Sequence, residues 1–506
     1  MSSVLWKTRK ALWDRLGILK FRAAKPALVP VPQDDPHKLG AVPLASQFPK
    51  IPISNILVAD RVPDDESSLS KTGAYDVQVG LYGTFGAMQD DLPSIDADPQ
   101  RALDEAYTEA HRKLYPAPVL PPELREPPDL GFLAVAGAFS RYTERAPEGG
   151  YQWDLRELGQ FEHHPGLRSL GVRVRFQVDA AARALRATHI ESELGVATPG
   201  DSSWELASRL ALCAASTHLS LVRHYNWIHL ALGSSFAIAT RNELPASHPL
   251  RRLLWPHMHG TQQSNAITTK GQMSPGGDFD SIWSLTHRGM CELFAHTWPA
   301  FPIVTMDPER DAARRGVLDA GFATPGVDNL RALFDVMHRH AARYLAAYYP
   351  TDDALRQDPA ARAWLDEMAR LTPNGLESVA GREITLAGTA RLIAACIYLA
   401  SVEHDALGTS LWNYQLWVHR IPARVYTDGR REPLDVYQRL VNANFNLNIH
   451  RTQLLSDFTY LALDAAGREC FQTFRRELEE LQARMDQEPH AHWKIYPNIL
   501  ESHING

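Results

Sequence analysis

The fold is decided by a stretch that reads Trp204-Glu-Leu-Ala207, Thr217-His218, His224, Ile228-His229 and Phe236-Ala-Ile-Ala-Thr240, then His248-Pro-Leu250 and Pro256-His257. Its first part is apolar and long, which predicts a helix over residues 204–240. The histidines in that helix point to chemistry, because neutral imidazole is a common protein ligand for divalent iron, zinc, copper or nickel.

The spacing of these histidines leaves two pairings open. His218 and His224 are six residues apart, and His224 and His229 are five apart. On a regular α-helix these separations place the side chains roughly 120° and 140° apart around the axis, so neither pair converges. A π-bulge, with one extra residue in a turn, would bring such a pair together, and π-bulges are frequent at functional sites.

The composition excludes several classes of protein. The chain has 506 residues and a net charge of −7, and no dense basic block follows the N-terminal region, so no nucleic-acid partner is expected. There are four cysteines, Cys213, Cys291, Cys396 and Cys470. They are far apart and form no Cys-x-x-Cys pair, which predicts reduced, buried thiols and a cytoplasmic protein. No apolar run is long enough to predict a transmembrane helix.

Residues 1–25 have the pattern of a basic amphipathic helix that carries Trp6 and Trp13. Such a helix either packs its apolar stripe on the protein body or lies on a membrane surface, which would make the protein peripheral to a membrane. A proline-rich segment follows and reads as a surface arm. We therefore expect two parts, an N-terminal helix and arm over residues 1–52 and a helical catalytic domain over residues 53–506.

The remaining pattern predicts a mainly α fold with a small β-containing region. Strict alternation predicts a strand pair over residues 172–178 and 185–190, turning near Asp179. Beyond the first long helix, further helices are expected over residues 258–272, 279–296, 327–348, 359–371, 385–415, 433–444 and 466–487.

These motifs together resemble the catalytic domain of the lipoxygenase family. The resemblance continues past His257 through Thr261, Asn265-Ala266, Gly277, Arg315-Gly316, the run Tyr344–Asp358 with Trp364 and Glu367, and Ser401-Val-Glu-His404. It implies a mainly helical fold and a non-haem iron centre, with manganese as the alternative metal. We expect the catalytic domain without the lipid-binding β-sandwich that precedes it in many eukaryotic members.

The resemblance also implies which groups hold the metal. Counted from Trp204, His224 falls at the family's second ligand and His218 lies one residue from the first, so His218 and His224 are assigned. The rival pair is His224 with His229, which has the family's five-residue spacing. His404 is implied as the third ligand. The main-chain carboxylate of Gly506 is implied as the fourth, with His503 as a substitute.

Two positions depart from the family pattern near the implied site. Gly408 stands where the family has an asparagine that ligates iron weakly, and it has no side chain that could do so. Pro275 stands where the family uses alanine or glycine to direct the position of oxygen attack. Pro275, Gly276 and Gly408 are accordingly expected to border the substrate.

The implied function is that of a dioxygenase. Its expected partners are a lipid or other small molecule and O2, bound by a monomer. Hydrogen would be abstracted from a bis-allylic methylene of a polyunsaturated fatty acid, and O2 would be inserted to give a hydroperoxide. No protein acid or base is expected to be needed. Two alternatives stay open: a divergent oxygenase or hydroperoxide-processing enzyme acting on another substrate, and a catalytically silent, membrane-associated scaffold.

Overall fold

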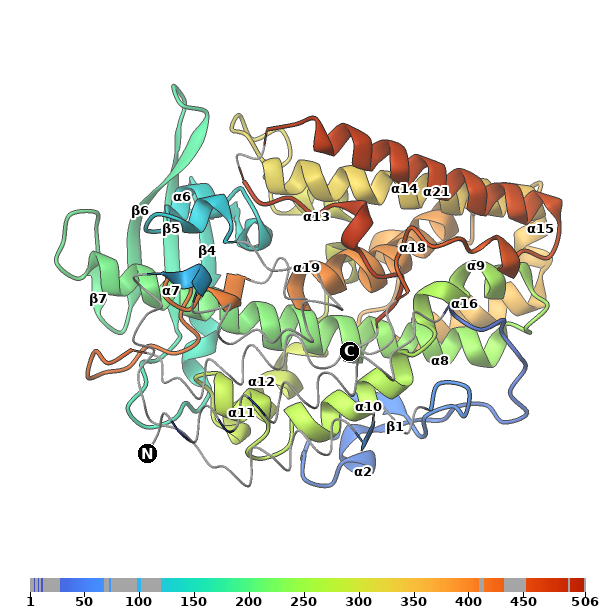
Figure 1. The fold of residues 1–506 in the computed structure, drawn as a ribbon, viewed down its shortest axis with the longest axis horizontal. Helices are drawn as coiled ribbons and strands as arrows, with labels where there is room; N and C mark the ends of the chain where they lie inside the picture. The colour runs from blue at the N-terminus through green and yellow to red at the C-terminus, as the bar shows by residue number, and fades with distance from the viewer. Residues whose placement is uncertain are drawn as a thin grey trace.

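One unbroken helical run forms the axis of the molecule. It consists of α7 (Trp204–His218), the π-helix η4 (Leu219–Gly233) and α8 (Ser234–Glu243), and it crosses the middle of Figure 1 in green. The computed structural model describes residues 28–67, 98–101, 120–408, 414–431, 452–489 and 492–504, with positions 4, 8, 11 and 72–73. The sequence prediction of a long helix at 204–240 is confirmed, and the π-helical segment within it is far longer than a single bulge.

A second helical run crosses the first. It consists of α18 (Leu386–Tyr398), the short π-helix η6 (Leu399–Glu403) and α19 (His404–Gly408). Thr385 caps its N-terminus, where the hydroxyl accepts a hydrogen bond from the Gly388 N–H. Residues Leu386–Leu407 are long and apolar enough to span a membrane, but most of this stretch is buried inside the protein. Its apolar character is therefore explained by its place in the core.

The other helices surround these two runs. α14 packs between α18 and α21, along the top of Figure 1, and α10, α11 and α12 lie below the axis. Their bounds are α9 Pro249–Met258, α10 Thr261–Gln272, α11 Asp278–Ile282, α12 His287–Thr297, α13 Pro308–Arg314, α14 Pro325–Tyr348, α15 Asp352–Gln357, α16 Pro359–Leu371, α17 Glu377–Ala380 and α21 Ala465–Asp486. Two short helices come earlier, α2 (Leu44–Gln47) and α6 (Leu130–Leu133).

A five-stranded antiparallel sheet stands at one end of the axis. Its strands follow chain order: β3 (Glu144–Arg145), β4 (Tyr151–Leu155), β5 (Val172–Asp179), β6 (Ala184–Ser192) and β7 (Gly195–Ala197). The predicted strand pair is β5 and β6, which meet in the register Asp179↔Ala184. On β5, Val172, Val174 and Phe176 are buried, which explains the alternation in the sequence.

The described part of the N-terminal arm is packed onto the body. β1 (Ala41–Pro43) pairs with β2 (Leu57–Ala59), so the boundary expected at residue 52 falls inside a hairpin. The indole of Trp255 donates a hydrogen bond to the Pro30 carbonyl. The arm thus behaves as part of the helical body from residue 28 onward.

Some helix predictions need correction. The single helix expected over 279–296 is two helices, because Thr286 starts a new one by accepting a hydrogen bond from the Gly289 N–H. Helix α9 was not expected as a separate element, although Pro249 at its first turn is a typical start signal. The amphipathic pattern of residues 1–25 and the helix expected at 433–444 lie outside the described residues, apart from positions 4, 8 and 11.

Candidate metal centre

Three histidines from the two crossing helical runs converge. His224 and His229 come from η4 and His404 begins α19, and one ligand atom from each lies within 4.8 Å of the others. The Nε2 atoms of His224 and His229 are 3.3 Å apart, and the His404 ring centroid lies 5.2 Å and 5.1 Å from theirs. A π-helix closes its turns with i→i+5 hydrogen bonds, so residues five apart share one side. The π-helical backbone of η4 therefore brings His224 and His229 to one side of the helix.

Neighbouring side chains orient two of the rings. Asn265 on α10 accepts a hydrogen bond at Oδ1 from His229 Nδ1, 2.9 Å away, and its amide nitrogen donates to the His229 carbonyl at 2.9 Å. His404 Nδ1 lies 3.3 Å from Asp405 Oδ1. With Nδ1 of His229 carrying the proton, its Nε2 lone pair faces the centre, as a metal ligand requires.

The electrostatics suit neutral imidazoles. Burial, and after it the neighbouring His229 and His404, hold the pKa of His224 well below its ordinary value. His229 and His404 are buried and His224 is half-buried. Three imidazole nitrogens facing one another inside the core form a donor set that fits a divalent transition metal such as iron.

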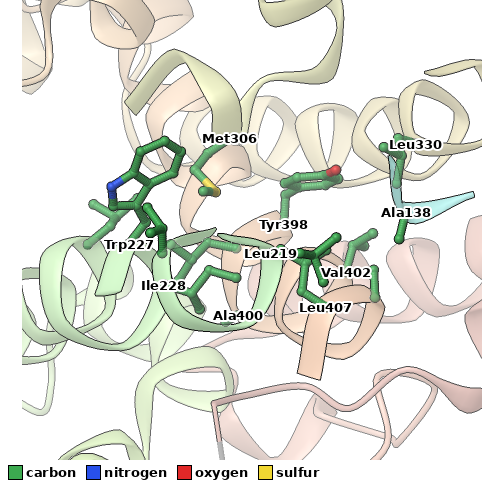
Figure 2. Close-up of a cluster of buried hydrophobic side chains, with 14 of the residues drawn as sticks. Ala138, Leu219, Trp227, Ile228, Met306, Leu330, Tyr398, Ala400, Val402 and Leu407 are labelled. Carbon is green, nitrogen blue, oxygen red and sulfur yellow. The ribbon is translucent and has the colours of Figure 1, made fainter. Parts of the chain in front are cut away.

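The two π-helical segments are held together by apolar packing. Figure 2 shows Leu219, Trp227 and Ile228 of η4 beside Ala400 and Val402 of η6. Met306, Tyr398 and Leu330 lie along the upper edge of the same cluster in that view. All of these side chains are buried. Because the cluster fixes how η4 and η6 approach each other, it also fixes the approach of the histidines they carry.

A buried ion network lies directly beside His404. Glu403 accepts hydrogen bonds from Arg141 Nη2 at 2.7 Å and from the Tyr398 hydroxyl at 3.1 Å. Arg223 Nη2 of η4 is 3.6 Å from Glu403 Oε1. The side chain of Glu403 is only 1% exposed, so its charge depends on these partners. The network connects the histidine-bearing runs to each other and to residues near the sheet.

The chain returns to this centre near its C-terminal end. The Ser502 carbonyl accepts hydrogen bonds from His257 Nδ1 at 2.8 Å and Ser401 Oγ at 3.3 Å, and the Glu501 N–H donates to Asp405. Ile504 is fully buried and lies against Gly233: a Cβ at Gly233 would fall 2.7 Å from Ile504 Cδ1 and 2.3 Å from the Ile228 carbonyl oxygen. Residues 501–504 are thus anchored against both helical runs.

The assignment of His218 to the centre needs correction. His218 ends α7, where its Nδ1 lies 3.1 Å from the Tyr142 hydroxyl and its Nε2 lies 3.6 Å from Glu157. The group that converges contains His229 in its place. The six-residue spacing fails because the π-helix begins only at Leu219, so His218 still follows the α-helical rotation. The five-residue spacing of His224 and His229 was the signal that identified the pair.

The other expected site residues are placed as follows. Pro275 and Gly276 are exposed in the turn between α10 and α11. Their expected place beside a substrate stays a prediction. Gly408 is the last residue of α19. His503 is buried with its Nδ1 2.9 Å from Ser502 Oγ, and the converging group does not include it. Gly506 lies outside the described residues.

The sequence predicts Asn265 only as part of the stretch that resembles the family, and it does not predict the contact of Asn265 with His229. Asn265 stands in the polar run Thr261-Gln-Gln-Ser-Asn265, where nothing in the sequence sets it apart.

Three histidines that converge inside a helical core form a candidate site for a single metal ion. The Lipoxygenase family model matches residues 186–444, about half of the chain, and spans all three histidines. The chain therefore belongs to the lipoxygenase family.

Individual relatives are distant. Linoleate 9S-lipoxygenase 2 of Oryza sativa subsp. japonica is 25% identical over 339 residues, covering 58% of this chain and 38% of that protein. Hydroperoxide isomerase ALOXE3 of Rattus norvegicus is 27% identical over 202 residues, covering 40% and 28%. The chain thus spans well under half the length of these relatives. The crystal structure of coral 8R-lipoxygenase matches with a TM-score of 0.73 at 16% identity, covering 92% of this chain and 78% of that one, which shows the shared fold.

Proposed function

We propose that this chain is a non-haem iron dioxygenase that converts a polyunsaturated fatty acid or a similar lipid to a hydroperoxide. The convergence of His224, His229 and His404 in the buried core carries this proposal. Iron held there would supply the one-electron chemistry that removes hydrogen from a methylene between two double bonds, before O2 adds to the carbon radical. Manganese is the alternative metal.

The protein's own part is to hold and shield the centre. Asn265 fixes the His229 tautomer, and the apolar packing of η4 against η6 keeps bulk water from the rings. Residues 501–504 pack beside His257, Ser401 and Gly233 and so border both histidine-bearing runs. No side chain is assigned as acid or base.

The test measures both the metal content and the turnover of a fatty acid. Elemental analysis of the purified full chain should find about one iron per chain, and linoleate should give O2 uptake with conjugated-diene absorbance. The His404→Ala variant should lose both, and a His163→Ala variant serves as control, since His163 lies outside the group. A metal-free wild-type protein with no turnover would contradict the proposal.

A second candidate is processing of a preformed hydroperoxide. Gly408 cannot supply the asparagine ligand expected from the family resemblance, and one relative is named a hydroperoxide isomerase. Iron without O2 uptake, together with loss of a fatty-acid hydroperoxide on incubation, would favour this candidate.

A catalytically silent scaffold that contacts membranes through residues 1–25 is the remaining alternative. It requires that His224→Ala and His404→Ala variants behave like the wild type in every assay.

A further inference from the structure

A small cavity lies within the buried ion network beside His404. It has a volume of about 10 Å³. The charged residues that border it are Arg141, Arg223, Arg315, Asp311 and Glu403. Arg223 directly precedes His224 in the chain, and Glu403 directly precedes His404. The cavity is therefore bordered by the immediate neighbours of two of the three converging histidines.

The guanidinium of Arg223 is buried without a hydrogen bond to the described residues. Only 5% of Arg223 is exposed, and its Nε has no hydrogen-bond partner in the described part of the chain. Its ionic contact, from Nη2 to Glu403 Oε1, is 3.6 Å long, which is too long for a hydrogen bond. Its Cζ lies 5.9 Å and 5.6 Å from the ring centres of Tyr142 and Trp227. Buried polar groups are normally hydrogen-bonded, so this guanidinium indicates a bound water or ion.

The other charged residues at the cavity pair with one another. Arg141 donates from Nη2 to Glu403 Oε2 at 2.7 Å. Arg315 donates from Nε to Asp311 Oδ2, also at 2.7 Å. These two pairs use both carboxylates that border the cavity. The positive charge of the third arginine therefore has no carboxylate of its own.

The acidic groups next to the cavity are neutral or engaged elsewhere. Burial raises the pKa of Tyr398 well above its ordinary value, so the hydroxyl of this lining residue stays neutral. Asp307 accepts a hydrogen bond from Arg391 Nη2 at 2.8 Å. Asp405 accepts one from the Glu501 N–H. The residues that border the cavity thus carry three positive charges and two negative ones.

We propose that this cavity binds one chloride ion. A single negative charge balances the lining residues and gives the Arg223 guanidinium an acceptor. A neutral water would accept the same hydrogen bond but would leave the buried charge uncompensated. The cavity is about as large as the roughly 10–15 Å³ that one water-sized sphere needs, so a monatomic ion fits and phosphate or a carboxylic acid does not.

The bound ion connects segments that are far apart in the sequence. Arg223 belongs to η4, whereas Arg315 follows α13. Arg315 is held by donating from Nη1 to the Ser140 and Thr143 carbonyls, at 3.1 Å and 2.6 Å. Chloride between these segments stabilises the folded protein and takes no part in turnover. The proposal is therefore independent of the proposed function, because it requires neither a bound metal nor a substrate.

The experiment follows thermal unfolding of the full chain while sodium chloride replaces sodium gluconate at constant ionic strength. The Tm should rise with chloride and then level off, as mass action requires of one site that exists only in the folded protein. Arg223→Met removes the guanidinium and keeps an unbranched side chain, and the apparent Kd for chloride should rise about tenfold or more. Arg475→Met removes the same charge from α21, outside the cavity, and should respond like the wild type.

A second measurement uses the wild-type protein and so does not depend on the folding of a variant. Long-wavelength diffraction from crystals grown in chloride should give an anomalous peak beside the Arg223 guanidinium, and crystals grown in gluconate should lack it. The proposal is overturned if chloride and gluconate give the same Tm, or if Arg223→Met keeps the wild-type affinity for chloride. It is also overturned if the cavity holds only a water, without anomalous signal, in both crystals.

Discussion

The Nε2 atoms of His224 and His229 lie 3.3 Å apart although the two residues are five positions apart on one helix. A regular α-helix would turn these side chains away from each other, whereas η4 brings them to one side. Residue spacing alone therefore does not identify the metal site; spacing and backbone type do so together.

Replacing His229 should have a different result from replacing His218. His229→Ala removes one of three converging imidazoles, and its iron content should fall to about a tenth of the wild type or less. His218→Ala should retain its iron, because His218 contacts Tyr142 and Glu157. Elemental analysis of both variants distinguishes the two pairings. Loss of iron in His218→Ala alone would favour His218 and His224 as the ligands.

Asn265 should matter for metal affinity without being a ligand. In Asn265→Leu the ring of His229 loses the acceptor that fixes its tautomer, so iron affinity should fall roughly 10- to 100-fold. Competition with a chelator measures the change. Asn55→Leu is the control, since the Asn55 amide bonds only to the Ala295 carbonyl. Equal chelator resistance in wild type and Asn265→Leu would refute the orienting role.

Gly233→Ala should disturb the packing of residues 501–504 against η4. The added Cβ would approach the Ile228 carbonyl oxygen to 2.3 Å and Ile504 Cδ1 to 2.7 Å. Overpacking of this kind costs about 1–3 kcal/mol. We expect a lower urea midpoint and faster proteolysis near residue 504. Gly73→Ala is the control, because an added Cβ there meets no atom within 4 Å. Ile504→Ala should partly rescue Gly233→Ala, and the absence of any rescue would disprove the proposed contact.

Glu403→Gln should be strongly destabilising. Arg141 lies buried with Glu403 as its carboxylate partner, and neutralising Glu403 leaves that guanidinium without balance. Breaking a buried pair from one side costs about 3–5 kcal/mol. Urea unfolding gives the difference, and Glu479→Gln, whose pair with Arg475 is exposed, should change stability by less than about 1 kcal/mol.

Asp358 should give a pH-dependent contribution to stability. Burial alone would raise the pKa of Asp358, but hydrogen bonds from Tyr349 and His248 outweigh it and lower the pKa below 3.8. A lowered folded-state pKa means that the stabilisation is present above about pH 4 and is lost as pH falls through the folded value.

Asp358→Asn keeps an N-cap oxygen for α16 but loses the charge that accepts from Tyr349 and His248. It should therefore be less stable by about 1–2 kcal/mol at pH 7, and the gap in stability to wild type should narrow in acid. Chemical denaturation at several pH values measures the gap. Asp366→Asn, at an exposed position, should show no such trend. A gap that widens toward low pH would contradict the assignment.

Much of the architecture could be predicted from the sequence. The periodicity at residues 204–240 and the alternation of Val172, Val174 and Phe176 report local geometry directly. The division into α11 and α12 was missed because Thr286 acts through one side-chain hydrogen bond that leaves no periodic trace. Placement of Pro275 and Gly276 at an exposed turn depends on how α10 ends in three dimensions, which a matched motif does not specify.

The site was predicted in part for a related reason. His404 and His224 are embedded in long apolar matches, whereas the choice between His218 and His229 depends on where the π-helix begins. The π-helix begins at Leu219, and the spacing of the histidines alone does not mark that boundary.

The anchored segment 501–504 also has a consequence for biosynthesis. Its partners Gly233, His257, Ser401 and Asp405 all emerge from the ribosome earlier, so this wall of the core stays open until synthesis has passed Ile504. The packing around Gly233 and Ser401 is therefore completed by the last described segment of the chain to be synthesised.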